Sequence, residues 1–185
     1  MLGLKKDEIQ LCEHDKEWPI EFEKEKKILT KILGKLAVSI EHVGSTAIPN
    51  LKAKPVIDIA VGIKDLSVLP EIMKRLSDEG YKVKGQWNEV LEETFVSKGV
   101  PECRTHNIHV EIYGGKNWNN QILFKKYLLN HPKAVKEYED MKLEMCAKFN
   151  GEENGRKQYQ ASKERVVSKM MEKAIKEFGW IKPLN

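Results

Sequence analysis

The chain has 185 residues, of which 41% are hydrophobic and 32% are charged. This composition supports one domain with an ordinary core and excludes a largely disordered chain. The formal net charge is +4, from 32 basic and 28 acidic side chains. Such a mixed surface does not fit a dedicated nucleic-acid binder, so nucleic acid is not an expected partner.

The first part of the chain predicts a helix, two strands and a second helix. Apolar residues recur at helical spacing within residues 18–36, and residues 38–44 are rich in β-branched side chains and end at a Gly-Ser turn. Residues 54–63 predict a second strand with a proline near its start, where strands tolerate it. A helix follows, with Asp65 as its N-cap and Gly80 at its end.

The later part of the chain changes from strands to helices. Further strands are expected at 81–85, 91–99 and 105–115, and helices at 118–132, 134–150 and 156–179. Few strands alternate with helices, so the sheet is expected to be mixed or largely antiparallel. We therefore expect one α+β domain over residues 1–185. It has a sheet core of about five strands at about 37–115, flanked by helices, and a helical C-terminal part at about 116–180.

Alternation along the second strand separates a buried face from a face that a ligand can approach. Ile57, Ile59, Val61 and Ile63 share one face, which must be buried. Asp58 therefore points to the opposite face, among small side chains. A capping or salt-bridged carboxylate is the structural alternative for this residue.

The strand expected at 105–115 places Asn107, His109 and Glu111 on its polar face. If this strand lies beside the second strand, with both apolar faces on the same helices, Asp58, His109 and Glu111 point into one cleft. Two carboxylates and an imidazole there are suited to hold a divalent cation or to act as a general base. A solvated sheet face is the alternative for His109 and Glu111.

The segment between the first two strands is a candidate phosphate site. Gly44 permits close approach of the backbone to a ligand, and Ser45 and Thr46 supply hydroxyl and N–H groups that suit phosphate oxygens. Lys52 and Lys54 follow in the same loop and can neutralise phosphate charge. We expect a nucleoside triphosphate or another phosphorylated small molecule as partner, although a Gly-Ser-Thr sequence after a strand is most often only a turn.

His42 precedes this turn and is a further candidate for the same site. By alternation it shares a face with Val38 and Ile40, which favours burial. The lysine and glutamate runs of the late helices are expected to be solvated faces. The methionine and tyrosine residues at helical spacing in those helices are expected in the core.

Several long strings in the sequence resemble the GrpB-like family. They are HVGSTAIPNLKAKPVIDIAVGI (42–63), HNIHVEIYGG (106–115), ILFKKYLLNHPKAVKEYEDMK (122–142) and YQASKERVV (159–167). The resemblance covers nearly the whole chain, from about Trp18 to the last helix. It implies the nucleotidyltransferase superfamily fold, in which a small mixed sheet is flanked by helices and followed by a helical part. Similar domains also occur fused to dephospho-coenzyme A kinase.

The superfamily pattern is a Gly-Ser turn, two acids one residue apart on a strand, and a third acid on a later strand. The resemblance assigns Gly44 and Ser45 to the turn. It assigns Asp58 to the first acid and Glu111 to the third, whereas Ala60 stands where the second acid is expected. In such enzymes the carboxylates hold metal ions, expected here to be Mg²⁺, that activate the attacking hydroxyl group.

The resemblance implies two possible functions. The first is Mg²⁺-dependent transfer of a nucleotidyl group to an unknown hydroxyl acceptor. Asp58 and Glu111 would hold the metal, and His109 would orient a ligand or move a proton. The alternative is a non-catalytic module that binds a nucleotide or a coenzyme on a degenerate nucleotidyltransferase scaffold, which Ala60 favours.

No apolar run in the sequence approaches the roughly 20 residues that a membrane span needs. The N-terminal segment MLGLKKDEIQ also lacks the apolar stretch of a signal peptide. The three cysteines are far apart in the sequence and do not suggest a disulfide framework. We therefore expect a cytoplasmic protein that does not contact a membrane.

Overall fold

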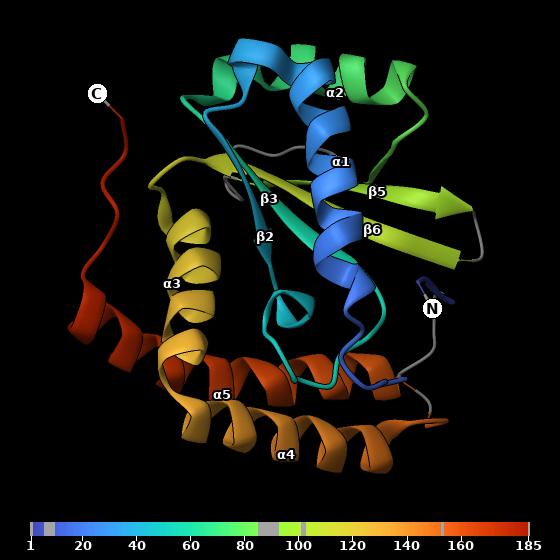
Figure 1. Ribbon diagram of the computed structural model, residues 1–185, viewed down its shortest axis with the longest axis vertical. Helices are drawn as coiled ribbons and strands as arrows, with labels where there is room; N and C mark the ends of the chain where they lie inside the picture. Colours follow the sequence, from blue (N-terminus) through green and yellow to red (C-terminus); the bar gives the residue numbers. More distant parts are fainter. Residues whose placement is uncertain (1, 6–9, 85–92, 101–102, 153, 185) are drawn as a thin grey trace.

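The computed structural model describes residues 2–5, 10–84, 93–100, 103–152 and 154–184, and a mixed β-sheet runs through its centre (Figure 1). The strands are β1 (Leu4–Lys5), β2 (Ser39–Val43), β3 (Ile57–Ile63), β4 (Lys82–Lys84), β5 (Glu93–Val100) and β6 (Cys103–Ile112). Their order is β2-β3-β6-β5-β4, and β1 pairs with one end of β6. Among the described strands, β3 and β6 form the single parallel pair. The predicted α+β fold with a mixed, largely antiparallel sheet is confirmed.

Helices cover both faces of this sheet (Figure 1). α1 (Glu17–Leu33) and α2 (Leu69–Asp78) pack on one face, and α3 (Lys116–Asn130) packs on the other. α4 (Pro132–Phe149) and α5 (Gly155–Phe178) pack against each other and form the predicted helical C-terminal part with α3. None of the helices in the described part of the chain is long and apolar enough to cross a membrane. The described residues also form three short 3-10 helices, η1 (Gly34–Leu36), η2 (Ser45–Ala47) and η3 (Leu66–Val68).

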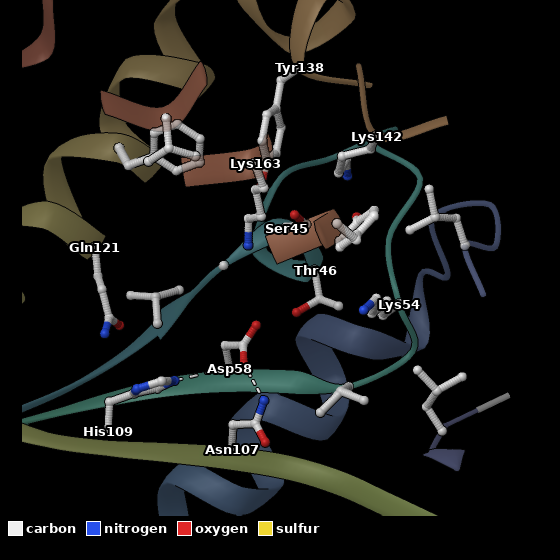
Figure 2. Close-up of a pocket in the computed structure, with 18 of the residues that line it drawn as sticks. Ser45, Thr46, Lys54, Asp58, Asn107, His109, Gln121, Tyr138, Lys142 and Lys163 are labelled. Carbon is white, nitrogen blue, oxygen red and sulfur yellow. Dashed lines mark hydrogen bonds and ion pairs between the residues drawn. The ribbon is translucent and has the colours of Figure 1, made fainter. Parts of the chain in front are cut away.

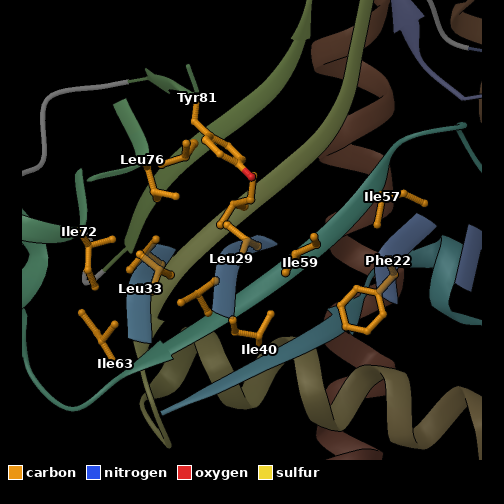
Figure 3. Close-up of a cluster of buried hydrophobic side chains, with 14 of the residues drawn as sticks. Phe22, Leu29, Leu33, Ile40, Ile57, Ile59, Ile63, Ile72, Leu76 and Tyr81 are labelled. Carbon is orange, nitrogen blue, oxygen red and sulfur yellow. The ribbon is translucent and has the colours of Figure 1, made fainter. Parts of the chain in front are cut away.

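Alternation along β3 builds the main core and turns Asp58 away from it. The apolar residues of β3 are fully buried beneath α1 and α2 (Figure 3). Burial of one such aliphatic side chain contributes roughly 1.5–3 kcal/mol. The predicted assignment of the two faces of β3 is therefore confirmed. The residues of this cluster that come from β3 are Ile57, Ile59, Val61 and Ile63, and those from α1 and α2 include Leu29, Leu33, Ile72 and Leu76.

Two of the differences from the predicted element boundaries have a clear local cause. β3 begins at Ile57 rather than at residue 54, because Pro55 has no N–H group to donate to a neighbouring strand. The segment expected to be one helix from residue 65 starts as η3, in which the Asp65 carboxylate accepts a hydrogen bond from the Ser67 N–H at 2.9 Å. Residues 85 and 91–92, at the ends of two predicted strands, lie outside the described residues.

A buried carboxylate on α1 accepts hydrogen bonds from Tyr81 and from β5. Glu25 is only 3% exposed, and the Tyr81 hydroxyl donates a hydrogen bond to Glu25 Oε1 at 2.5 Å. Lys98 Nζ on β5 donates to Glu25 Oε2 at 2.7 Å. Burial, together with the hydrogen bond to Glu25, raises the pKa of the Tyr81 phenol, so Tyr81 is the donor at every physiological pH.

Replacing Tyr81 with phenylalanine keeps the ring but removes this donor. We expect the free energy of unfolding to fall by about 1.5–3 kcal/mol, which is typical of a hydrogen bond to a charged group. Urea denaturation of Tyr81→Phe measures the effect. The matched control is a double-mutant cycle with Glu25→Gln, in which the cost of Tyr81→Phe should shrink. An equal cost in both backgrounds would contradict the assigned hydrogen bond.

Candidate functional site

A cavity of about 750 Å³ lies between the sheet face that carries Asp58 and the helices α3, α4 and α5 (Figure 2). Its lining is strongly asymmetric in charge. Asp58 is the one carboxylate among the lining residues that the structure describes. The basic side chains of the lining are Lys54, Arg104, Lys142, Lys157 and Lys163.

The floor of the cavity is formed by β3 and β6, whose parallel register places Asp58 opposite Asn107 and Ala60 opposite His109. Asn107 Nδ2 donates a hydrogen bond to Asp58 Oδ1 at 2.7 Å, and His109 Nε2 lies 3.9 Å from the same oxygen. Burial alone would raise the pKa of Asp58. The His109 imidazole, the Asn107 amide and the charge of Lys163 outweigh burial and hold this pKa below its ordinary value.

The turn from β2 into η2 passes directly over the Asp58 carboxylate. Gly44 has φ = 71° and ψ = −171°, a combination that side-chain-bearing residues rarely adopt. A Cβ atom at this position would also overlap Asp58 Oδ2. Glycine is therefore required here for two reasons, and its absence of a side chain brings Ser45 to the edge of the cavity beside Asp58 (Figure 2).

The opposite wall comes from the C-terminal helices. Tyr138 and Lys142 are four residues apart on α4, and Tyr159 and Lys163 have the same spacing on α5. This spacing places each pair on one side of its helix. Lys54 Nζ completes the wall from the η2–β3 loop, 4.5 Å from the centroid of the Tyr159 ring.

Two lysines of this wall differ in their electrostatic environment. Lys142 is 2% exposed, and burial, reinforced by the charge of Lys163, lowers the pKa of Lys142 to about 7. Tyr138, Asp58 and Tyr159 instead hold the pKa of Lys163 above its ordinary value, against the opposing effect of burial. Lys163 is therefore a permanent cation in the cavity, whereas the charge of Lys142 changes near neutral pH.

The structure brings six of the nine predicted site residues to the cavity. They are Gly44, Ser45, Thr46, Lys54, Asp58 and His109. Thr46 is almost fully buried, and its Oγ1 lies 3.0 Å from Nε2 of His42, so its hydroxyl group is turned toward His42.

Glu111 lies outside this cavity, although it belongs to the same strand face as His109. The register places Glu111 opposite Gly62, four residues along β6 from Asn107. At about 3.3 Å per residue this separates it from the level of Asp58 by about 13 Å. Glu111 is fully buried, and Gln121 Nε2 donates a hydrogen bond to its Oε1. The prediction that Asp58 and Glu111 point into one cleft is therefore wrong.

Lys52 and His42 also lie outside the lining of the cavity. Lys52 Nζ forms an ion pair with Glu13 Oε1 at 2.9 Å, so its charge is directed away from the cavity. His42 is buried on the core side of β2, where its ring stacks on Phe22 at 4.8 Å between centroids. Burial, followed by the charge of Lys125, lowers the pKa of His42 to about 4, so the ring is neutral at pH 7.

The donor set of the cavity does not fit the pair of metal ions that the family resemblance implies. Two-metal sites need several carboxylates around a shared centre. Here the second acid is replaced by Ala60, Glu111 lies far along the strand, and Lys163 is a cation near Asp58. The described residues form no group of three or more His, Cys, Asp or Glu side chains able to hold a metal ion.

Comparison with known proteins identifies the family of the chain. The family model described as GrpB protein matches residues 8–173. The chain belongs to the GrpB family. The glutamate-rich protein GrpB of Alkalihalophilus pseudofirmus is 34% identical over 176 residues, which cover 92% of this chain and 98% of that protein. The crystal structure of the conserved protein GrpB from Enterococcus faecalis has a TM-score of 0.80 and 25% sequence identity, and the match covers 91% of this chain and 99% of that chain.

A longer protein contains a segment similar to this GrpB-family chain. The dephospho-CoA kinase of Mycobacterium bovis is 26% identical over 166 residues. The match covers 77% of this chain but only 41% of that kinase.

The helical half of the site was not predicted from the sequence. The lysines of the late helices were predicted to be solvated, whereas Lys142 and Lys163 line the cavity. The prediction of buried tyrosines is confirmed for Tyr138 and Tyr159, which also line the cavity. The repeated Tyr-x₃-Lys spacing on α4 and α5 was the available signal, although it does not separate cavity lysines from surface lysines. Asn107 was on the predicted polar face but was not selected.

Proposed function

We propose that this GrpB-family chain binds a nucleotide or a related phosphorylated small molecule in the cavity. The observation that carries the proposal is the meeting of the Gly44–Ser45 turn with Lys54, Lys142 and Lys163 around one space of about 750 Å³. This volume lies within the range of about 300–1,000 Å³ that is common for small-molecule sites. The excess of cationic groups over carboxylates favours an anionic ligand.

The remaining lining residues suit the non-phosphate part of such a ligand. Phe124, Tyr138 and Tyr159 offer aromatic surface for a base or another planar group. Asn120 and Gln121 on α3 offer amide donors and acceptors for hydrogen bonds. The cavity thus combines a basic part with an apolar and amide-lined part, which is the composition expected for a nucleotide or coenzyme.

Binding accounts for these side chains better than Mg²⁺-dependent nucleotidyl transfer does. Transfer requires carboxylates that hold the metal ions and activate the acceptor hydroxyl group. Asp58 alone supplies a carboxylate to the described lining. The non-catalytic module implied by the family resemblance is therefore the function that the geometry supports best.

Calorimetric titration with ATP, GTP, CTP, UTP and dephospho-CoA tests the proposal. Dephospho-CoA is included because one relative is named dephospho-CoA kinase. We expect at least one of these ligands to bind, and Lys54→Gln to weaken its binding by about fivefold or more through loss of a charged contact.

Lys52→Gln is the matched control. Lys52 is two residues from Lys54 and carries the same charge, but its side chain faces Glu13 instead of the cavity. The affinity of Lys52→Gln should equal that of the wild type. Absence of binding by all five probes, or equal losses in the two variants, would contradict the proposal. A nucleotidylated product formed in the presence of Mg²⁺ would instead support the transfer reaction.

A further inference from the structure

The cavity contains a charge arrangement that a metal site would not use. A carboxylate that holds Mg²⁺ normally has other oxygen ligands beside it and no competing cation at the same oxygen atoms. Asp58 instead has an amide donor, an imidazole and the Lys163 ammonium group as neighbours. Its negative charge is therefore balanced by protein groups.

Lys163 occupies a central position in this arrangement. It extends from α5 beside Tyr138, and its Nζ points toward Ser45 and Asp58 (Figure 2). Tyr138, Asp58 and Tyr159 all favour its charged form. The ammonium group thus lies in the cavity and faces the carboxylate on the floor (Figure 2).

The residues around Asp58 do not supply the further oxygen ligands that a metal ion would need. Ala60 presents a methyl group at the second acid position and is packed with Val43 and Trp118. A divalent cation beside Asp58 would also be repelled by the positive charge of Lys163, which acts on the same carboxylate. These two facts disfavour a metal ion at Asp58 on the basis of the side chains that are present.

We infer that the cavity holds the phosphate groups of its ligand without a metal ion, and that Lys163 supplies the cation that a metal ion would otherwise provide. The inference rests on the proposed function and specifies how the ligand is held. The charge of Asp58 favours the ammonium form of Lys163 in the cavity. A phosphate oxygen then receives a charged hydrogen bond from Lys163 instead of a bond to Mg²⁺.

Calorimetric titration with ATP in EDTA and in excess Mg²⁺ tests this inference. We expect the wild type to bind ATP under both conditions, with dissociation constants that agree within about threefold, because no metal ion is required at Asp58. The remaining difference reflects the smaller negative charge of the Mg²⁺ complex of ATP. Lys163→Gln should weaken ATP binding in EDTA by about tenfold or more, which corresponds to the loss of one charged hydrogen bond. Lys163→Arg keeps the charge and should retain most of the affinity.

Lys173→Gln is the matched control, because Lys173 lies on the same helix but is exposed to solvent. It should bind ATP as the wild type does, and circular dichroism should show that both glutamine variants are folded. ATP binding that is lost in EDTA, or wild-type affinity in Lys163→Gln, would overturn the inference while leaving the proposed function intact. If ATP binds under neither condition but another probe binds, the same two titrations are made with that probe. If no probe binds, the proposed function itself is refuted.

Discussion

Gly44→Ala is expected to lower the free energy of unfolding by about 3 kcal/mol and to abolish ligand binding. The backbone at Gly44 has φ = 71° and ψ = −171°, so alanine is strained there before any contact is considered. The new Cβ atom would also overlap Asp58 Oδ2. Relief of this overlap must move either the turn or the carboxylate, and both line the cavity. Urea denaturation and calorimetric titration measure the two effects.

Gly151→Ala provides a matched control for the strain of the backbone. Gly151 also has a positive φ, of 85°, but nothing lies within 4 Å of a Cβ atom built there. Its replacement should cost about 1 kcal/mol and leave ligand binding unchanged. If Gly44→Ala and Gly151→Ala had the same cost and both retained binding, close contact of the turn with Asp58 would be ruled out.

A pH dependence of ligand affinity is expected from Lys142. Burial lowers its pKa to about 7, so Lys142 is charged below pH 7 and neutral above it. An anionic phosphate stabilises the charged form, so binding should be accompanied by proton uptake near pH 7.5. We expect affinity to fall by about tenfold between pH 6 and pH 8.5, as one charged contact is lost.

Titrations in buffers of different ionisation enthalpy measure the number of protons taken up. Lys142→Met is the control, because it removes the titrating group while retaining an extended apolar stem. The second ionisation of a phosphate group has a pKa of about 6 and opposes the trend, and the variant reports this contribution separately. Identical proton uptake in wild type and Lys142→Met would show that another group titrates.

The sequence predicted the sheet half of the site because alternation is a local property. Within β3 the period of two assigns Ile57 to the core and Asp58 to the opposite face without knowledge of any neighbour. The same rule assigned a face to His109 and Glu111, but it contains no information on register. Register depends on how β6 pairs with β3, and this pairing places Asn107 and His109, rather than Glu111, near Asp58.

The helical half of the site depends on tertiary packing. Helical periodicity identified the apolar stripes of α4 and α5, and cores such as the cluster containing Leu123 and Met170 follow from those stripes. Tyr138 is buried within this cluster, whereas the same helical pattern fits Lys163 either as a solvated side chain or as one that lines a cavity. Only the docking of α4 and α5 near the turn at Gly44 decides between the two.

Residues that line the cavity can lie far apart in the sequence. Asp58 on β3 and Lys163 on α5, for example, are more than ninety positions apart. A ligand that touches both would act as a non-covalent cross-link between the sheet and the last helix. Its binding should therefore slow amide hydrogen exchange in β3 and α5 together. During synthesis the sheet leaves the ribosome first, so on the proposed function we expect ligand binding only after α5 has been made.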